Sequence, residues 1–244
     1  MIPCAENPKF LLALTTTYKA HWQDKVKEID KLKLKEIALF PTCLELDKRK
    51  ELYSLLEKTG IKNIPLTHLR TDCEAWEIEY LIKRFNCRLF NIHADNLAQG
   101  FLDRCQKYHH LIYIENGEHY QINPYFEKIL DQVAGLCLDF SHWEDYEARQ
   151  DLKNYRDFKK YIGKYKVGCA HISAMKEVCY KSLDLDGNEF QFYASHFMKK
   201  LSEFDYVKDY LQYLPQYTAI EIENSFAEQI KVKEYLEQLL KKYS

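Results

Sequence analysis

LIYIENG (residues 111–117) and GLCLDFSHW (residues 135–143) are the two stretches of this sequence that decide its fold. Each is a short, nearly continuous apolar run with an acid at its end, Glu115 in the first and Asp139 in the second. Parallel strands that are covered on both faces have this composition, because neither face meets water. We therefore predict two buried parallel strands, each with a carboxylate at its C-terminal end.

Six further runs of the same kind are spread along the chain. They are FLLALTTTY (10–18), EIALFPT (36–42), IKNIPLTHL (61–69), CRLFNIHA (87–94), YKVGCAHISA (165–174) and YTAIEIENS (217–225). Amphipathic helical patterns lie between them. One covers residues 46–58, and Gly60 follows it as a stop signal. We expect Asp72 to cap a second helix, and Asn224–Ser225 to precede the last one.

Eight strands that alternate with helices are typical of an α/β fold with a parallel sheet. Eight such units in one chain of 244 residues favour closure into a barrel, since these barrels typically run to about 250 residues. No GxGxxG motif follows the first strand, which weakens a dinucleotide-binding alternative. We predict a single (β/α)8 TIM barrel, one domain covering residues 1–244.

The spacing of the runs points to an extra segment. The seventh run starts at residue 165 and the eighth at residue 217, a gap of 52 residues, whereas no other gap exceeds 30. A longer loop is therefore expected after the seventh strand. Loops that follow barrel strands are where active-site machinery tends to lie.

Composition limits the partners and the compartment. With 35 basic and 37 acidic residues, the net charge of −2 offers no electrostatic case for a nucleic-acid or anionic-membrane partner. The eight cysteines form no CxxC pair, so we interpret them as reduced thiols. The N-terminus lacks a signal-peptide pattern, and no run approaches 18 apolar residues. A cytoplasmic protein without a membrane span is the expectation.

Acids and imidazoles gather where the predicted strands end, and in a barrel these ends meet at one mouth. The residues concerned are His68, His93, Glu115, Asp139 with His142 three residues later, His171, and the pair Glu221 and Glu223.

Four of these residues come from consecutive strands: Glu115, Asp139, His171 and Glu223. Three carboxylates and an imidazole that converge would repel one another unless a cation held them. This donor set suits one divalent ion, Mn²⁺, Mg²⁺, Co²⁺ or Zn²⁺. Such an ion would polarise a carbonyl group, and two carboxylates on opposite sides of it could move a proton between adjacent carbons.

The neighbouring residues have plainer interpretations as well. His68 and His93 are expected to contact substrate or to be structural rather than to bind metal. Trp143 either walls the pocket or packs, and Lys176 either meets an anionic substrate group or lies in solvent. Glu221 could be a barrel-interior residue that pairs with a Lys or Arg. We assign it no role in the site.

These motifs resemble the xylose-isomerase-like barrel superfamily, which includes sugar isomerases, sugar epimerases and endonuclease IV. The resemblance is carried by LIYIENG, GLCLDFSHW, VGCAHISA and AIEIEN. In the epimerase branch, the matching Glu, Asp, His and Glu hold one divalent metal and the two glutamates transfer the proton. The resemblance implies these roles for Glu115, Asp139, His171 and Glu223, and substrate contact for His142.

The endonuclease branch is the first alternative. There His68 and His93 would match two histidines of a three-zinc cluster, but Ala194 stands where that cluster needs an Asp before His196. We therefore predict a metal-dependent isomerase or epimerase of a small carbohydrate-like substrate. A zinc phosphodiesterase or abasic-site endonuclease, and a non-catalytic binding barrel, are the alternatives. The sequence does not identify the substrate or the metal. The oligomeric state also stays open, and a homo-oligomer is one possibility.

Overall fold

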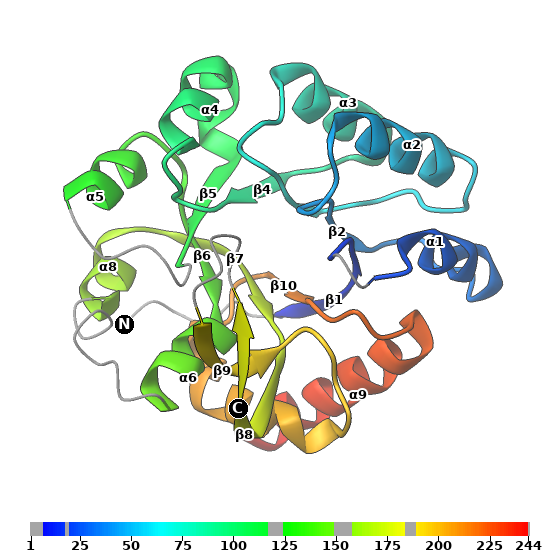
Figure 1. Cartoon of the computed structure of the whole chain (residues 1–244), viewed down its shortest axis with the longest axis vertical. Coiled ribbons are helices and arrows are strands. Elements are labelled where there is room, and N and C mark those ends of the chain that lie inside the picture. The colour runs from blue at the N-terminus through cyan, green and yellow to red at the C-terminus, as the bar shows by residue number, and fades with distance from the viewer. Residues whose placement is uncertain (1–6, 18–19, 117–123, 149–157, 184–188, 244) are drawn as a thin grey trace.

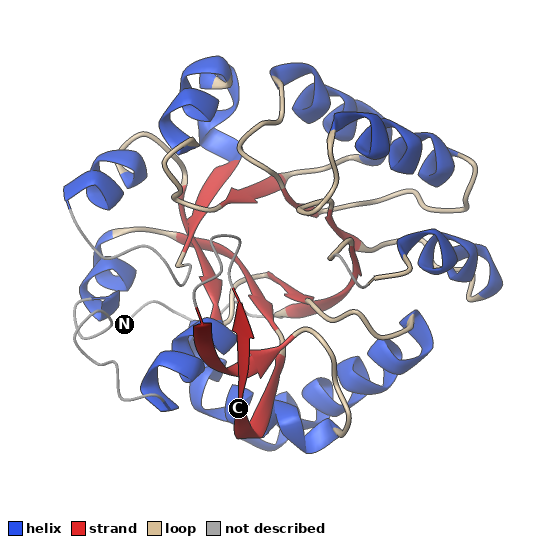
Figure 2. Cartoon of the chain, in the orientation of Figure 1, coloured by secondary structure: helices blue, strands red, loops and turns tan. Residues whose placement is uncertain are grey.

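Eight parallel strands close into a barrel in the computed structural model, which describes residues 7–17, 20–116, 124–148, 158–183 and 189–243. The strand order around the barrel is β1-β10-β7-β6-β5-β4-β3-β2. Helices ring the barrel on its outside (Figure 1), and the strands occupy its centre (Figure 2). The predicted single (β/α)8 barrel is confirmed.

Each barrel strand matches one of the predicted apolar runs. The strands are β1 (Lys9–Thr15), β2 (Ala38–Phe40), β3 (Leu66–His68), β4 (Leu89–Ile92), β5 (Ile112–Glu115), β6 (Gly135–Asp139), β7 (Val167–Ile172) and β10 (Tyr217–Ile220). The α-helices are α1 (Trp22–Lys31), α2 (Leu46–Glu57), α3 (Ala75–Phe85), α4 (Ala98–Arg104), α5 (Pro124–Leu130), α6 (Phe140–Ala148), α8 (Phe158–Lys164) and α9 (Phe226–Tyr243). A 3₁₀ helix, η1 (Gln106–Leu111), precedes β5.

The two faces of the strands bury different sets of side chains. The outer face packs against the helices and contributes large apolar residues such as Phe90, Ile114 and Leu138. The inner face mixes small residues such as Ala13 and Cys137 with large ones such as Phe40 and Tyr113. Side chains alternate between the two faces along a strand. When a residue near the start of a strand points inward, the residue two positions later also points inward and lies nearer the mouth of the barrel.

The start of α3 differs from the prediction. The helix begins at Ala75, and Glu74 and Glu77 form a capping box in place of a cap at Asp72. Asp72 instead receives hydrogen bonds from the guanidinium groups of Arg49 and Arg70. The last helix starts as predicted, since the Ser225 hydroxyl accepts the backbone N–H of Glu228.

The extra segment after the seventh strand is an antiparallel hairpin rather than an unstructured loop. Its strands are β8 (Ala174–Leu183) and β9 (Glu189–Ser195), and a 3₁₀ helix, η2 (Leu201–Tyr213), leads back to the barrel. The hairpin projects over the side of the barrel that carries α6 and α9 (Figure 1). Asp145 of α6 fixes it, because its Oδ1 atom accepts the backbone N–H groups of Tyr193 and Ala194.

Two further expectations concern a membrane span and the state of the cysteines. Within the described ranges, no helix is long and apolar enough to cross a membrane. Seven of the eight cysteines lie in the described residues and all seven carry free thiols, as predicted; Cys4 lies outside them.

Candidate metal centre

Four neighbouring strands deliver one buried cluster at the mouth of the barrel. Glu115 ends β5, Asp139 ends β6, His171 lies on β7, and Glu221 follows the last residue of β10. Asp139 and His171 are direct neighbours in the β6–β7 register. All four side chains are buried. The cluster is therefore built by strand register, the most rigid part of the fold.

His171 lies at the centre of this cluster. Its Nε2 atom is 3.0 Å from Oε2 of Glu115. Its Nδ1 atom is 3.1 Å from Oδ2 of Asp139 and 2.7 Å from Oε2 of Glu221. Three overlapping groups of donor atoms lie close enough to hold a metal ion: His68, Glu115 and His171; Glu115, Asp139 and His142; and Asp139, His171 and Glu221.

Several of these atoms have no hydrogen-bond partner among the described residues: both ring nitrogens of His171, Oε1 of Glu115 and Oδ2 of Asp139. Buried polar atoms are normally hydrogen-bonded, since leaving them unpaired is costly. These atoms contact one another only as ion pairs, and all are of types that bind divalent ions, so a metal ion could take the place of the His171 proton among them. The residues present therefore fit the metal that the sequence predicts.

The charges of the cluster depend on one another. Burial alone would raise the pKa of the Glu115 carboxyl, but His171, His93 and His68 outweigh it and hold that pKa well below its usual range. Burial would lower the pKa of His171, but Glu115 and Glu221 raise it well above its usual value. In the metal-free protein the His171 imidazolium thus balances part of the carboxylate charge. A bound cation would take over that balance and release the proton.

Supporting hydrogen bonds orient the carboxylates. The Ser141 hydroxyl and the His142 backbone N–H both donate to Oδ1 of Asp139, which leaves Oδ2 directed at the cluster. The Asn91 amide donates to Oε2 of Glu115 at 3.0 Å. Partners of this kind fix the orientation of ligands in metal sites.

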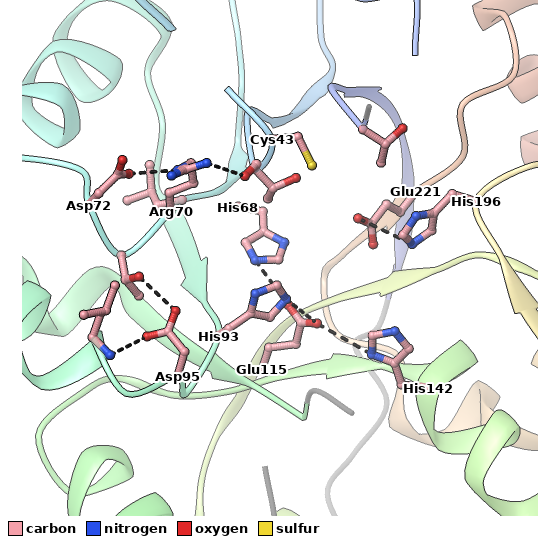
Figure 3. Close-up of a pocket in the computed structure, with 15 residues that line it drawn as sticks. Cys43, His68, Arg70, Asp72, His93, Asp95, Glu115, His142, His196 and Glu221 are labelled. Carbon is pink, nitrogen blue, oxygen red and sulfur yellow. Dashed lines mark hydrogen bonds and ion pairs between the residues drawn. The ribbon is translucent and has the colours of Figure 1, made fainter. Parts of the chain in front are cut away.

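Three more histidines surround Glu115 on the side of the open mouth, as Figure 3 shows. The distances from Glu115 oxygens are 3.5 Å to Nε2 of His68, 3.4 Å to Nε2 of His93 and 3.8 Å to Nδ1 of His142. Burial lowers the pKa of His68 to about 3, so its ring is neutral. A neutral imidazole is the form that contacts a substrate hydroxyl or a metal.

The cluster opens into a cavity of about 490 Å³. Glu115 and Glu221 line this cavity together with His68, His93, His142 and His196 (Figure 3). Asp139 and His171 do not line it, and both are almost fully buried. The two glutamates are thus the acidic members of the cluster that a substrate in the cavity would meet.

Comparisons with known proteins bear on the fold. No protein-family profile matches this sequence, and no curated protein matches it. Solved structures are similar to it. Three of them are the apo form of the 3-keto-D-glucoside 4-epimerase YcjR from E. coli, a xylose isomerase domain containing protein from Salmonella typhimurium LT2, and AsfvAP:AG.

All three likenesses are distant. The epimerase shares 11% identity over 96% of this chain and 99% of its own, with a TM-score of 0.43. The xylose isomerase domain protein shares 10% over 96% of each chain, with a TM-score of 0.47. AsfvAP:AG shares 14% over 96% of this chain and 99% of its own, with a TM-score of 0.43. The closed parallel barrel itself confirms the fold that the resemblance to xylose-isomerase-like barrels implies.

Glu223 does not join the cluster. It lies beyond the end of β10, where its carboxylate accepts a hydrogen bond from the Thr17 hydroxyl and its backbone N–H donates to the His196 carbonyl. Alternation along an extended strand would place Glu221 and Glu223 on one side, but β10 ends at Ile220 and the chain turns there, with the Ile222 backbone N–H donating to the Ile220 carbonyl, so only Glu221 lies beside His171. Glu221, which the sequence left without an assigned place, is thus the glutamate that lies beside His171.

Two other predicted substrate contacts lie away from the cavity. Trp143 is buried on α6, where its indole N–H donates to Glu147 and its ring stacks on Tyr213. Lys176 of β8 forms an ion pair with Glu203 at 2.7 Å. Neither residue lines the cavity. Trp143 therefore packs, as its plainer interpretation predicted, and Lys176 holds the hairpin to η2.

Sequence reasoning missed Asn91 as the hydrogen-bond donor to Glu115. A signal for it was present, because its neighbours Phe90 and Ile92 are apolar and face the helices. Alternation then turns Asn91 inward. His196 was noticed only as a partial motif, and the structure places its Nε2 atom 3.9 Å from Oε1 of Glu221.

Proposed function

We propose that this protein is a metal-dependent isomerase or epimerase of a small polyhydroxy carbonyl compound. The observation that carries the proposal is the position of Glu115 and Glu221. Both belong to the buried cluster around His171, and both line the cavity. A carbon atom bound between them would have a carboxylate within reach on either side. One carboxylate could act as the base that removes a proton from such a carbon, and the other as the acid that returns one.

The metal would be held by Glu115, Asp139, His171 and Glu221. When bound, one divalent ion would polarise a carbonyl oxygen and stabilise the negative charge of an enediolate. His68 and His93 at the mouth would orient hydroxyl groups of the substrate, and His142 would do so from α6. In the wall behind the site, Ser141 and Asn91 keep the ligand carboxylates in place.

The lining of the cavity favours an uncharged substrate. Its acids are Asp72, Asp95, Glu115 and Glu221. Among the described residues that line it, Arg70 is the one lysine or arginine, and that side chain is already engaged by Asp72 and Glu45. A phosphate group would therefore meet carboxylates rather than a free cation. A volume of about 490 Å³ lies in the range of small-molecule sites.

The proposal is tested by proton exchange with solvent. Aldoses and ketoses would be incubated in heavy water with the metal-loaded protein, and deuterium at the carbon next to the carbonyl would be measured by NMR. We expect exchange with a subset of sugars, and its loss in Glu115→Gln and Glu221→Gln. Glu223→Gln is the matched control, and it should retain exchange. No exchange with any sugar, although the protein holds metal, would refute the isomerase.

A second function is favoured by one specific observation. His68 and His93 lie 3.5 and 3.4 Å from different oxygens of Glu115. A carboxylate flanked in this way could bridge two metal ions, as in phosphodiesterases that use a metal pair. The metal content decides between the two functions. About one ion per chain supports the isomerase, whereas two or three zinc ions support the phosphodiesterase.

A further inference from the structure

A second cavity lies at the other end of the barrel. Its volume is about 320 Å³. It is lined by residues at or just before the starts of β4, β7 and β10, among them Arg88, Lys166 and Tyr217. The starts of parallel strands meet at the end opposite to the mouth, so this cavity opens away from the metal centre. We call it the floor cavity.

Tyr113 closes the barrel above the floor cavity. It lies on β5 two residues before Glu115, and its side chain faces the barrel interior with Cys137 and Cys169. Its ring extends to Gly168, where a Cβ atom would lie only 2.0 Å from the ring. A residue larger than glycine at position 168 would thus displace the tyrosine. Because glycine has no side chain, the Tyr113 ring can lie across the floor of the barrel at this position.

The hydroxyl group of Tyr113 has an unusual position. The residue is only 3% exposed, yet it lines the floor cavity, and its hydroxyl makes no hydrogen bond within the described part of the chain. Burial raises the pKa of Tyr113 to about 12, so the group keeps its proton and remains a donor. A tyrosine hydroxyl that opens onto a cavity can donate to a group bound there. Here the space from which a partner could come is the floor cavity.

The charges around the floor cavity are of one sign. Arg88 and Lys166 line it, both are exposed, and neither side chain forms an ion pair with a described residue. Within the described part of the chain, no aspartate or glutamate lines this cavity. The chain as a whole carries more acids than bases, and four carboxylates line the cavity at the mouth. The floor cavity therefore offers cationic side chains to a ligand, whereas the cavity at the mouth also offers carboxylates.

We propose that the floor cavity is a binding site for a small organic anion, a carboxylate or a phosphate monoester. Its charged group lies between Arg88 and Lys166 and accepts the hydrogen bond of the Tyr113 hydroxyl. Its apolar part packs against Leu214 and Pro215, which line the same cavity. Charged hydrogen bonds of this type are stronger than neutral ones, and arginine suits both carboxylate and phosphate. The site is independent of the metal and of the proposed reaction.

The test is a calorimetric titration of the whole chelator-treated protein with three probes. Benzoate and phenyl phosphate represent the two anions, and benzyl alcohol is the neutral control. We expect saturable binding of at least one anion and none of the alcohol. The tighter of the two anions identifies the charged group. Because chelation removes bound metal, binding to a metal ion does not contribute.

Variants then locate the binding. Arg88→Ala, Lys166→Ala and Tyr113→Phe should each weaken the anion about tenfold or more, the loss expected for one hydrogen bond that involves a charged group. Lys62→Ala removes an exposed cation outside the lining and is the matched control, with unchanged affinity. Failure of both anions to saturate, equal binding of benzyl alcohol, or undiminished binding in Arg88→Ala and Lys166→Ala would overturn the proposal. The two cation variants change exposed side chains, so the test does not depend on whether Tyr113→Phe folds.

Discussion

Oε2 of Glu221 lies 2.7 Å from Nδ1 of His171, while the carboxylate of Glu223, two residues later, accepts a hydrogen bond from Thr17. The two glutamates follow the same strand in nearly the same sequence context. Because their surroundings differ, replacing each glutamate in turn tests which of them belongs to the candidate metal centre.

Glu221→Gln should remove most of the bound metal, because the amide keeps the shape of the side chain and loses its charge. Glu223→Gln should leave the metal content unchanged. Elemental analysis of the two variants beside wild type measures the difference. Metal lost from Glu223→Gln and kept by Glu221→Gln would show that the ligand set has been assigned to the wrong glutamate.

Asn91→Leu should weaken metal binding about 10-fold to 100-fold, the usual effect of removing a hydrogen bond that orients a ligand. The Asn91 amide N–H donates to Glu115, and its Oδ1 atom is buried without a partner. The metal-free variant should therefore unfold at a temperature close to that of metal-free wild type. Competition with a metal-sensitive chelator gives the affinity. A fall in melting temperature without a change in affinity would make Asn91 a purely structural residue.

Lys25 should make the free energy of unfolding depend on pH in the alkaline range. Its Nζ atom donates to Thr15 and to the Ile222 carbonyl, and burial lowers its pKa from 10.5 to about 8. Between these two values the unfolded chain binds more protons than the folded chain, so the free energy of unfolding rises as the pH increases. The gain from about pH 7.5 to about pH 10 is about 2 kcal/mol.

Lys25→Met isolates this effect, because all other titrating groups are shared. The Ile222 carbonyl still accepts hydrogen bonds from Thr15 and Gln229 in the variant. Urea unfolding at both pH values should show the rise in wild type and a smaller rise, or none, in Lys25→Met. If the free energy of unfolding rises equally with pH in the two proteins, Lys25 is not the group that titrates.

Glu77→Gln should destabilise the fold by about 3 kcal/mol, because it leaves the buried Arg49 without its main counter-charge. Arg49 of α2 and Glu77 of α3 pair through two hydrogen bonds of 2.8 and 2.9 Å, and both side chains are almost fully buried. The exposed pair Lys48–Glu51 provides the control, and Glu51→Gln should change stability by less than about 1 kcal/mol. Equal losses in the two variants, measured by urea unfolding, would contradict this reasoning.

The sequence by itself determined the barrel and most of its candidate centre. Eight apolar runs are too continuous for half-exposed strands, and their alternation with helices permits few arrangements other than a parallel sheet covered on both sides. The acids and imidazoles that end these runs then had to meet at one mouth. Glu115, Asp139 and His171 could be placed together for this reason alone.

Only the tertiary structure decided which atoms meet. Glu221 and Glu223 share a face, and the choice between them depended on where β10 ends relative to β7, which alternation does not specify. Trp143 and Lys176 follow the right strands but are turned away by packing on α6 and by the ion pair with Glu203. Periodicity fixes the face of a strand on which a residue lies. The height along the strand is fixed by register and by the loop that follows, and both arise from contacts between segments far apart in the sequence.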